Sequence, residues 1–331
     1  MTSAPLPEAK AEQRNLAKYL FLAVQVVVSL GLLVWVLSGV DFTNVLAALH
    51  GANYWLLALA VLILPVHVVA NAWRWQYVWP TDPARPEQQK PGIGTLTQLI
   101  FIGLFFNQIL PPPVGGDAVR TIGAKRLGLG YTAGALSVFI ERVWGLITVT
   151  LFILPTLPFL LADLLPDGIT PTGLAIGLLL VALVGLVVGF KLLLWLCQHL
   201  EDRLQKELPV NLIRQLRTTT LEPKSALWLL LLSMLGQLPP LLSIMMIGIA
   251  LPGDIGAGTA LLVAPLALFA TVVPISFAGW GLREGVMVTA LASQGISSAQ
   301  ALALSLAFGV GLLLISLPGA VLFRLKRREN G

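Results

Sequence analysis

Long apolar runs separated by short polar stretches dominate the sequence. An apolar helix of about 20 residues spans the ~30 Å hydrocarbon core of a bilayer, whereas the strands of a membrane barrel would alternate apolar and polar positions. The runs do not alternate. The pattern therefore predicts an all-α integral membrane protein with about six spanning helices, at residues 19–38, 54–73, 132–161, 173–197, 225–251 and 301–323.

Two further apolar stretches, 93–109 and 256–273, run into breaks rich in proline, glycine and polar residues, at 107–120 and 274–284. The arm after the first break would cover only about 20 Å as a helix, which is too short to span. We therefore expect two re-entrant helical hairpins, each entering and leaving on one side. Non-helical backbone at their tips must be buried in protein or line a wet cavity.

Composition and charge agree with this interpretation. Hydrophobic residues make up 56% of the chain, charged residues only 11%, and the mean hydropathy is +0.86, values that do not fit a soluble domain. The net charge of +5 does not predict a nucleic-acid partner, because Lys and Arg gather at the ends of apolar runs and so report topology. Cys197 is the only cysteine, which excludes a disulfide framework or zinc cluster, and we expect it to pack as a small apolar residue.

The positions of Lys and Arg predict the topology, with both termini cytoplasmic. Helix, helix, hairpin and helix are followed by the same order begun from the opposite side, which is an inverted-topology repeat. The predicted divisions are a tail at 1–18, a single transmembrane domain at 19–323 with repeats 19–161 and 173–323, an outside turn at 162–172, a cytoplasmic connection at 198–224 and a tail at 324–331.

Ionisable residues at membrane depth cost about 2.5–3.5 kcal/mol each and are therefore candidates for function. Arg120 and Arg283 each lie at the start of a returning arm, where a helix N-terminus offers free N–H groups. An arginine fork beside such an end suits a phosphate. We expect the two arginines to bind a lipid phosphate, while Asp117, Glu141 and Glu284 balance charge or couple protons.

The candidate substrate-binding residues come from the two breaks and from the middle of the run 132–161. They are Asn107, Gln108, Gly115, Gly116, Asp117, Arg120, Glu141, Arg142, Ser276, Gly279, Gly281, Arg283 and Glu284.

Structural roles remain open for several of these residues. Asp117 could cap a helix that begins at Ala118, and Glu141 could neutralise Arg120, Arg142 or Arg283 as a buried pair. Glu284 could form a local ion pair or couple protons.

Outside the breaks, His67 shares a helix face with Asn71 and Arg74, and we expect it to pack at an interface. Glycines spaced four apart in 173–197 predict close helix packing; they are Gly173, Gly177, Gly185 and Gly189.

Three motifs, in this order, together resemble the lysylphosphatidylglycerol synthase transmembrane region family of flippase-like proteins, and the resemblance covers nearly the whole chain. The motifs are Phe106-Asn107-Gln108-Ile109-Leu110-Pro111 with Val114-Gly115-Gly116-Asp117-Ala118-Val119-Arg120, then Glu141-Arg142-Val143-Trp144-Gly145-Leu146, and Pro274-Ile275-Ser276 with Gly279-Trp280-Gly281-Leu282-Arg283-Glu284-Gly285. The chain departs from the family pattern at Pro111-Pro112-Pro113, where small residues are usual. The resemblance implies a lipid-handling protein of the bacterial inner membrane without the fused aminoacyl-transfer domain.

We therefore expect a lipid translocase that is not an enzyme, whose partners are the bilayer and a membrane lipid with an anionic headgroup. The alternatives are a membrane enzyme acting on a lipid, with Glu141 or Asp117 as general base, an accessory subunit of lipid or lipid-linked glycan synthesis, or a scaffold presenting 203–224. A second copy or a lipid-synthesis enzyme stays open as a protein partner. The sequence has no metal-ligand cluster, nucleophile–base pair or nucleotide-phosphate loop, so we expect no cofactor and no metal.

Overall fold

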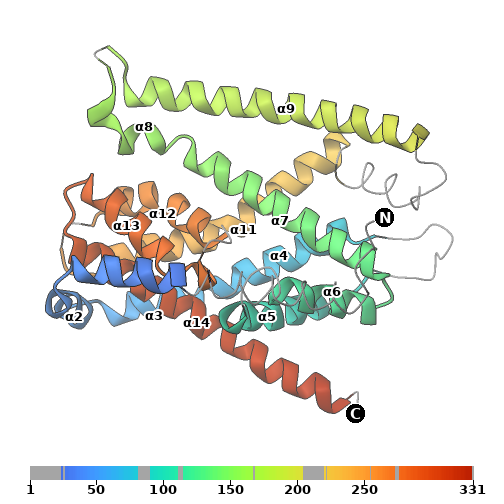
Figure 1. Ribbon diagram of the computed structural model, residues 1–331, viewed down its shortest axis with the longest axis horizontal. Helices are drawn as coiled ribbons and strands as arrows, with labels where there is room; N and C mark the ends of the chain where they lie inside the picture. The colour runs from blue at the N-terminus through green and yellow to red at the C-terminus, as the bar shows by residue number, and fades with distance from the viewer. Residues whose placement is uncertain are drawn as a thin grey trace, which may run out of the picture.

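The computed structural model describes residues 24, 27–80, 90–110, 115–166, 168–203, 220, 222–253, 255–272 and 276–329, and over these residues every regular element is a helix (Figure 1). The elements are a first helix Val27–Ser38, α2 Phe42–His50, α3 Tyr54–Leu62, α4 Leu64–Val78, α5 Ile93–Ile109, α6 Gly116–Arg126, α7 Tyr131–Ile153, α8 Leu157–Leu160, η1 Ala162–Leu164, α9 Pro171–Arg203, α11 Pro223–Ala250, α12 Ala257–Val272, η3 Phe277–Gly279, α13 Leu282–Ala292 and α14 Ser298–Glu329.

Five helical segments among the described residues are long and apolar enough to cross a membrane. They are Tyr54–Tyr77, Tyr131–Ile153, Pro171–Gly189, Pro223–Ala250 and Ser298–Lys326. A sixth arises if Val27–Ser38 and α2, which are bent by 84° at the break between them, count as one. The predicted all-α membrane fold is confirmed.

The two short apolar helices α5 and α12 begin and end within a residue of the predicted hairpin arms. Each packs against the 11-residue helix that follows it, α6 or α13. At 1.5 Å per residue these helices are about 16–25 Å long, too short to span a ~30 Å core. The second tip reaches the first hairpin, because η3 contacts α5.

Two copies of one helix order, α4–α7 and α11–α14, make matching contacts. Within each copy the long first helix packs on the first arm of the hairpin, and the second arm packs on the long last helix. The copies interlock, since α4 packs against α11, α5 against α14, and α12 against α7. In Figure 1, α5 and α6 occupy the right-hand half of the bundle and α12 and α13 the left-hand half, so the hairpins enter from opposite ends.

One end of the bundle carries much of the positive charge of the described residues. The right-hand end in Figure 1 contains the last residues of α9 and α14 and the first residues of α7 and α11. The Lys and Arg residues near these points are Lys125, Arg126, Lys224, Arg324 and Lys326. This clustering is the pattern from which the topology was predicted.

Close approach of backbones holds the first hairpin together. A Cβ on Gly116 would lie 2.3 Å from the carbonyl oxygen of Gly103, so no larger residue fits where α6 begins against α5. At the second hairpin Gly281 has a φ of +84°, and a Cβ there would lie 2.8 Å from the carbonyl oxygen of Ser29. Glycine is the residue that tolerates such a φ, so conformation and space both require it at Gly281, whereas at Gly116 the lack of space alone requires it.

Several predicted boundaries are wrong, including the ends of the helices 54–73 and 301–323, which continue to Val78 and Glu329. Residues 39–53, expected to form a turn between the predicted helices 19–38 and 54–73, contain α2. Its N-cap Asp41 accepts a hydrogen bond from the Thr43 amide at 2.9 Å, a capping signal that stabilises a helix start. The predicted helix 132–161 stops at Ile153, just before Pro155, which has no N–H to continue the ladder. The helix predicted to end at residue 197 continues as α9 to Arg203.

Two predictions about proline and glycine are also wrong. Proline lacks the N–H of the helical ladder, so Pro239-Pro240 predicts a break in the helix 225–251, yet α11 stays helical from Pro223 to Ala250. Three glycines of α9 do not pack on another described helix, because a Cβ on Gly177, Gly185 or Gly189 would meet nothing within 4 Å. Among the described helices, α9 packs mainly against α8.

Some sequence predictions fall outside the described residues. They concern the tail 1–18 and residues 19–23 of the first helix, the tip residues Pro111 to Val114, most of the connection 198–224, the tip residues Pro274 and Ile275, and the side chain of Cys197.

Candidate functional site

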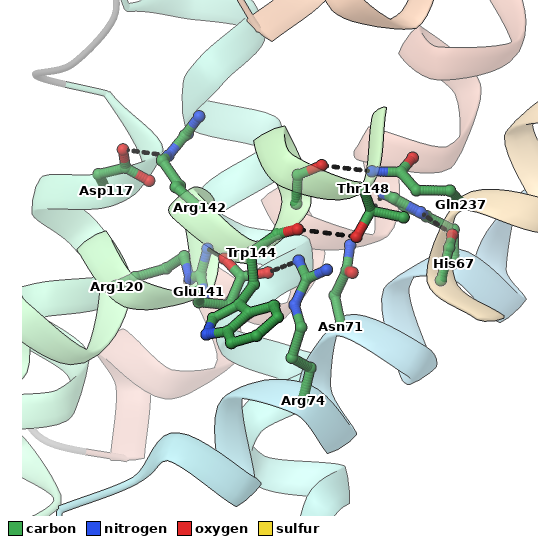
Figure 2. Close-up of polar contacts among 12 residues, drawn as sticks. His67, Asn71, Arg74, Asp117, Arg120, Glu141, Arg142, Trp144, Thr148 and Gln237 are labelled. Atoms are coloured by element: carbon green, nitrogen blue, oxygen red, sulfur yellow. Dashed lines mark hydrogen bonds and ion pairs between the residues drawn. The ribbon is translucent and has the colours of Figure 1, made fainter. Parts of the chain in front are cut away.

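A buried cluster of three charged side chains joins α4, α6 and α7 (Figure 2). Arg74 donates from Nη2 to Oε1 of Glu141, and Arg120 donates from Nη1 to Oε2 of the same carboxylate at 2.9 Å. Arg74 is 3%, Arg120 7% and Glu141 4% exposed. We call these residues the triad. With two guanidinium groups and one carboxylate, it has a net charge of +1.

The triad also has unused hydrogen-bond donors. Nε and Nη1 of Arg74, and Nε and Nη2 of Arg120, are buried without an acceptor among the described residues. The ring of Trp75 lies 4.3 Å from the guanidinium carbon of Arg120, a cation–π contact that offsets part of the cost of burial. Buried donors normally have partners, so the triad can accept another anion.

Asp117 and Arg142 form an ion pair at the edge of the triad (Figure 2), with side chains 19% and 38% exposed. The alternative in which Asp117 caps α6 is wrong, because Gly115 is the N-cap and Asp117 lies inside the first turn. The amide of Gly116 is satisfied by Asn107, whose Oδ1 accepts its hydrogen bond at 2.8 Å. Asp117 is therefore free to neutralise Arg142 at the rim.

Further polar contacts join α11 to α4 and α7. His67 Nδ1 lies 2.5 Å from the carbonyl oxygen of Gly236, and Asn71 Nδ2 lies 2.8 Å from His67 Nε2. Nearby, Gln237 donates to the carbonyl of Gly145 at 3.5 Å. Figure 2 shows these groups in a row between Asp117 and α11. His67 thus lies at a helix interface, as predicted.

The second hairpin carries a separate cluster. Arg283 donates from Nε and Nη2 to Oε1 of Glu284, at 3.0 and 2.5 Å. Glu284 also accepts from the Ser305 hydroxyl at 3.2 Å and from the Gly281 amide at 2.6 Å. Arg283 is 1% exposed and Glu284 0%, and the Trp280 ring lies 4.8 Å from the guanidinium carbon. This Arg283–Glu284 cluster is electrically neutral.

The structure groups the predicted site residues by hairpin. Near the first lie Asn107, Gly115, Gly116, Asp117, Arg120, Glu141 and Arg142, and near the second lie Ser276, Gly279, Gly281, Arg283 and Glu284. Gln108 is half-buried in the last turn of α5. No hydrogen bond or ion pair among the described residues joins the triad to the Arg283–Glu284 cluster. Arg120 and Arg283 therefore have different partners.

The sequence suggested three possible ion-pair partners for Glu141. One of these three is among the two partners that Glu141 has in the structure. Arg120 is a partner, whereas Arg142 pairs with Asp117 and Arg283 with Glu284. The missed partner is Arg74. The sequence did contain an indication of this role, because Arg74 shares a helix face with His67 and Asn71 at a membrane depth where an unpaired charge is costly.

Two apolar grooves lie elsewhere on the bundle, and no Asp, Glu, Lys or Arg lines either one. One, of about 440 Å³, runs between the first helix, α8 and α13; the other, of about 630 Å³, runs between α3 and α14. Neither includes a residue of the triad. Across the described residues, no three His, Cys, Asp or Glu side chains are grouped in a way that could hold a metal ion.

Comparison with known proteins agrees with the motif resemblance. A family model described as the lysylphosphatidylglycerol synthase TM region matches residues 22–319. No curated protein matches the chain. Because the family match covers nearly the whole sequence and the apolar helices could cross a membrane, the chain belongs to this family and is a multi-pass membrane protein.

Proposed function

We propose that this member of the lysylphosphatidylglycerol synthase transmembrane region family moves a lipid with an anionic, phosphate-bearing headgroup between the leaflets of a membrane. The observation that carries the proposal is the triad, a buried +1 cluster with four donor atoms lacking acceptors among the described residues. A transported anion is the partner that such a cluster lacks.

Charge balance favours an anion at this position. Leaving a charge uncompensated in a buried environment costs several kcal/mol, and Arg74 and Arg120 share one carboxylate. A phosphodiester carries one negative charge and can accept hydrogen bonds from two guanidinium forks at once. Its arrival would make the cluster neutral and give the unused donors acceptors.

The rim pair gives the headgroup a route to the triad. Arg142 and Asp117 are the more exposed charges of the cluster, so Arg142 is the first cation that a headgroup reaches. Arg120 lies behind it, one turn along α6 from Asp117. The acyl chains need not leave the bilayer, because the headgroup alone requires a polar path.

The repeat supplies a way to reach the site from both leaflets. Transporters built from inverted repeats place their substrate near the midplane, between discontinuous helices, and open to each side in turn. Here the two hairpins enter from opposite ends and η3 touches α5. The membrane we propose is the bacterial inner membrane, with both termini in the cytoplasm.

Leaflet exchange of a fluorescently labelled phosphatidylglycerol in proteoliposomes tests this function. Arg120→Ala removes the surplus cation but leaves the neutral Arg74–Glu141 pair, so the protein should still fold. We expect exchange to slow at least about tenfold, the loss that follows from one charge-assisted hydrogen-bond partner. Arg126→Ala, which removes an exposed arginine of the same helix, should exchange lipid at the wild-type rate.

An Arg120→Ala protein that exchanges lipid as fast as wild type would contradict the proposal. Mass spectrometry of the recovered lipid separates translocation from the enzyme alternative, because a transferase would return a chemically altered lipid.

A further inference from the structure

We propose that the triad takes up a proton together with its anion and that His67 is the residue that binds this proton. The inference rests on the proposed function and adds to it a coupling ion. It concerns a side chain outside the charged clusters, on the same helix as Arg74 and one turn of helix before Asn71.

The carboxylates of the two clusters already have cationic partners. Glu141 lies between two guanidinium groups and Glu284 contacts Arg283. Asp117 is paired with Arg142. The hydrogen-bond partners of His67 are uncharged, namely the carbonyl of Gly236 and the amide of Asn71, and histidine is the side chain that ordinarily titrates between pH 5 and 8.

The hydrogen bond that Pro240 cannot make within α11 explains how His67 is held. Pro240 has no N–H, so the carbonyl of Gly236, four residues earlier, loses its partner in the helical ladder. His67 Nδ1 lies 2.5 Å from that oxygen and donates to it. Nε2 then carries no proton, and it accepts a hydrogen bond from the Asn71 amide at 2.8 Å. The imidazole is therefore neutral, with one nitrogen free to be protonated.

Protonation at Nε2 would change two things at once. The new N–H would face the amide group of Asn71, which must rotate to present its oxygen, and the positive charge near the triad would rise.

The charged groups that face this region are Arg74 on α4, Arg120 on α6 and Glu141 on α7. Of the other helices packed on α4, α3 and α5 carry no charge, α11 carries only Lys224, and α14 is charged only from Arg324 onward.

Anion and proton should therefore promote each other's binding. Before an anion binds, a proton on His67 is repelled by the net charge of +1 on the triad. After a monoanion has bound, the triad is neutral and this repulsion is gone. His67 and Arg74 are seven residues apart, which is about 10.5 Å along a helix. Two charges about 10 Å apart in an effective dielectric of about 20 change each other's binding about tenfold, and the effect is reciprocal.

Calorimetry on the full chain in detergent can measure this linkage, with dihexanoyl phosphatidylglycerol as the probe. Titrations in two buffers of different ionisation heat give the number of protons taken up per lipid bound. For wild type we expect a fraction of a proton toward pH 5 and an affinity that falls about tenfold between pH 5 and 8. His67→Gln should bind lipid without proton uptake and with no such pH dependence. His50→Gln, which changes an exposed histidine at the end of α2, should behave as wild type.

A second variant covers the case in which His67→Gln does not fold. Asn71→Asp places a carboxylate beside Nε2 and should move the pH midpoint of proton uptake upward by about one unit or more. A wild-type midpoint in Asn71→Asp, or undiminished proton uptake in His67→Gln, would overturn the inference. Lipid binding without any proton uptake in wild type would overturn it and leave the proposed function intact, whereas no lipid binding at any pH would overturn both.

Discussion

Both hairpins place an arginine near the start of the returning arm, and in both the arginine contacts a carboxylate. The two clusters differ in net charge and in the number of helices they join. Arg283 and Glu284 are neighbours in sequence and neutralise each other within α13. Arg120 shares Glu141 with Arg74, so three helices meet around one carboxylate. The Arg283–Glu284 cluster is therefore neutral, whereas the triad carries one more positive than negative charge.

The satisfied cluster has the character of a structural clamp. Glu284 accepts the Gly281 amide at the tip and the Ser305 hydroxyl from α14, in addition to Arg283. It thereby fixes the tip to the last helix of the repeat. The first tip uses the uncharged amide of Asn107 for the same purpose. The first tip therefore needs no carboxylate, and Glu141 pairs with Arg74 and Arg120 instead.

Glu141→Gln should give the largest effect, because it leaves two buried guanidinium groups without a counter-charge. We expect a loss of about 3–5 kcal/mol in the free energy of unfolding, seen as a fall of about 10 °C in the thermal midpoint in detergent. Arg74→Met combined with Glu141→Gln returns the cluster to +1 and should recover part of the loss. An unchanged midpoint in the single variant would mean that the triad is not a folding element.

Arg283→Ala should have the next largest effect on stability. Comparing it with Arg120→Ala distinguishes the roles of the two arginines. It leaves Glu284 buried and charged, although the carboxylate keeps its hydrogen bonds from Gly281 and Ser305, so we expect about 3 kcal/mol of destabilisation. Arg120→Ala should lower the thermal midpoint much less, since a neutral pair remains. Arg283→Met with Glu284→Gln removes both charges and should restore most of the stability. Equal thermal midpoints for Arg283→Ala and Arg120→Ala would contradict the view that the two clusters differ in their contribution to stability.

Asp117→Asn should have the smallest effect on stability, below about 1 kcal/mol, because its ion pair with Arg142 is partly exposed. Its effect on binding should be opposite in sign to that of Arg120→Ala. Removing this carboxylate raises the positive charge around the triad, so short-chain phosphatidylglycerol should bind a few-fold more tightly at low salt, and the gain should shrink as salt screens it. Weaker binding, measured by calorimetry, would instead assign Asp117 a direct role in holding the headgroup.

The helical fold could be predicted from the sequence because it follows from local properties. The length of each apolar run sets how far it reaches, and the positions of Lys and Arg set which ends lie together. The arms 93–109 and 256–273 were predicted to within a residue of α5 and α12. Errors arose where capping overrode the pattern, as at Asp41, or where a proline was tolerated, as at Pro240.

The candidate site could be predicted only in part. The sequence pointed to the ionisable residues at membrane depth, because their cost there does not depend on the partner. It did not reveal Arg74 as the second partner of Glu141, nor Asp117 as the partner of Arg142. It also could not show that Gly236 lacks a helical donor that His67 supplies, since that contact joins residues 169 positions apart.

The sequence by itself determined that this chain is a membrane protein with two broken, arginine-bearing hairpins, because hydrophobic length, charge and proline are read along the chain. Only the tertiary structure decided which charges meet. Arg74 and Arg120 are 67 and 21 residues from Glu141, and which side chains share a carboxylate depends on how each helix is rotated against its neighbours. That packing leaves the first hairpin with an unmatched positive charge and the second with none.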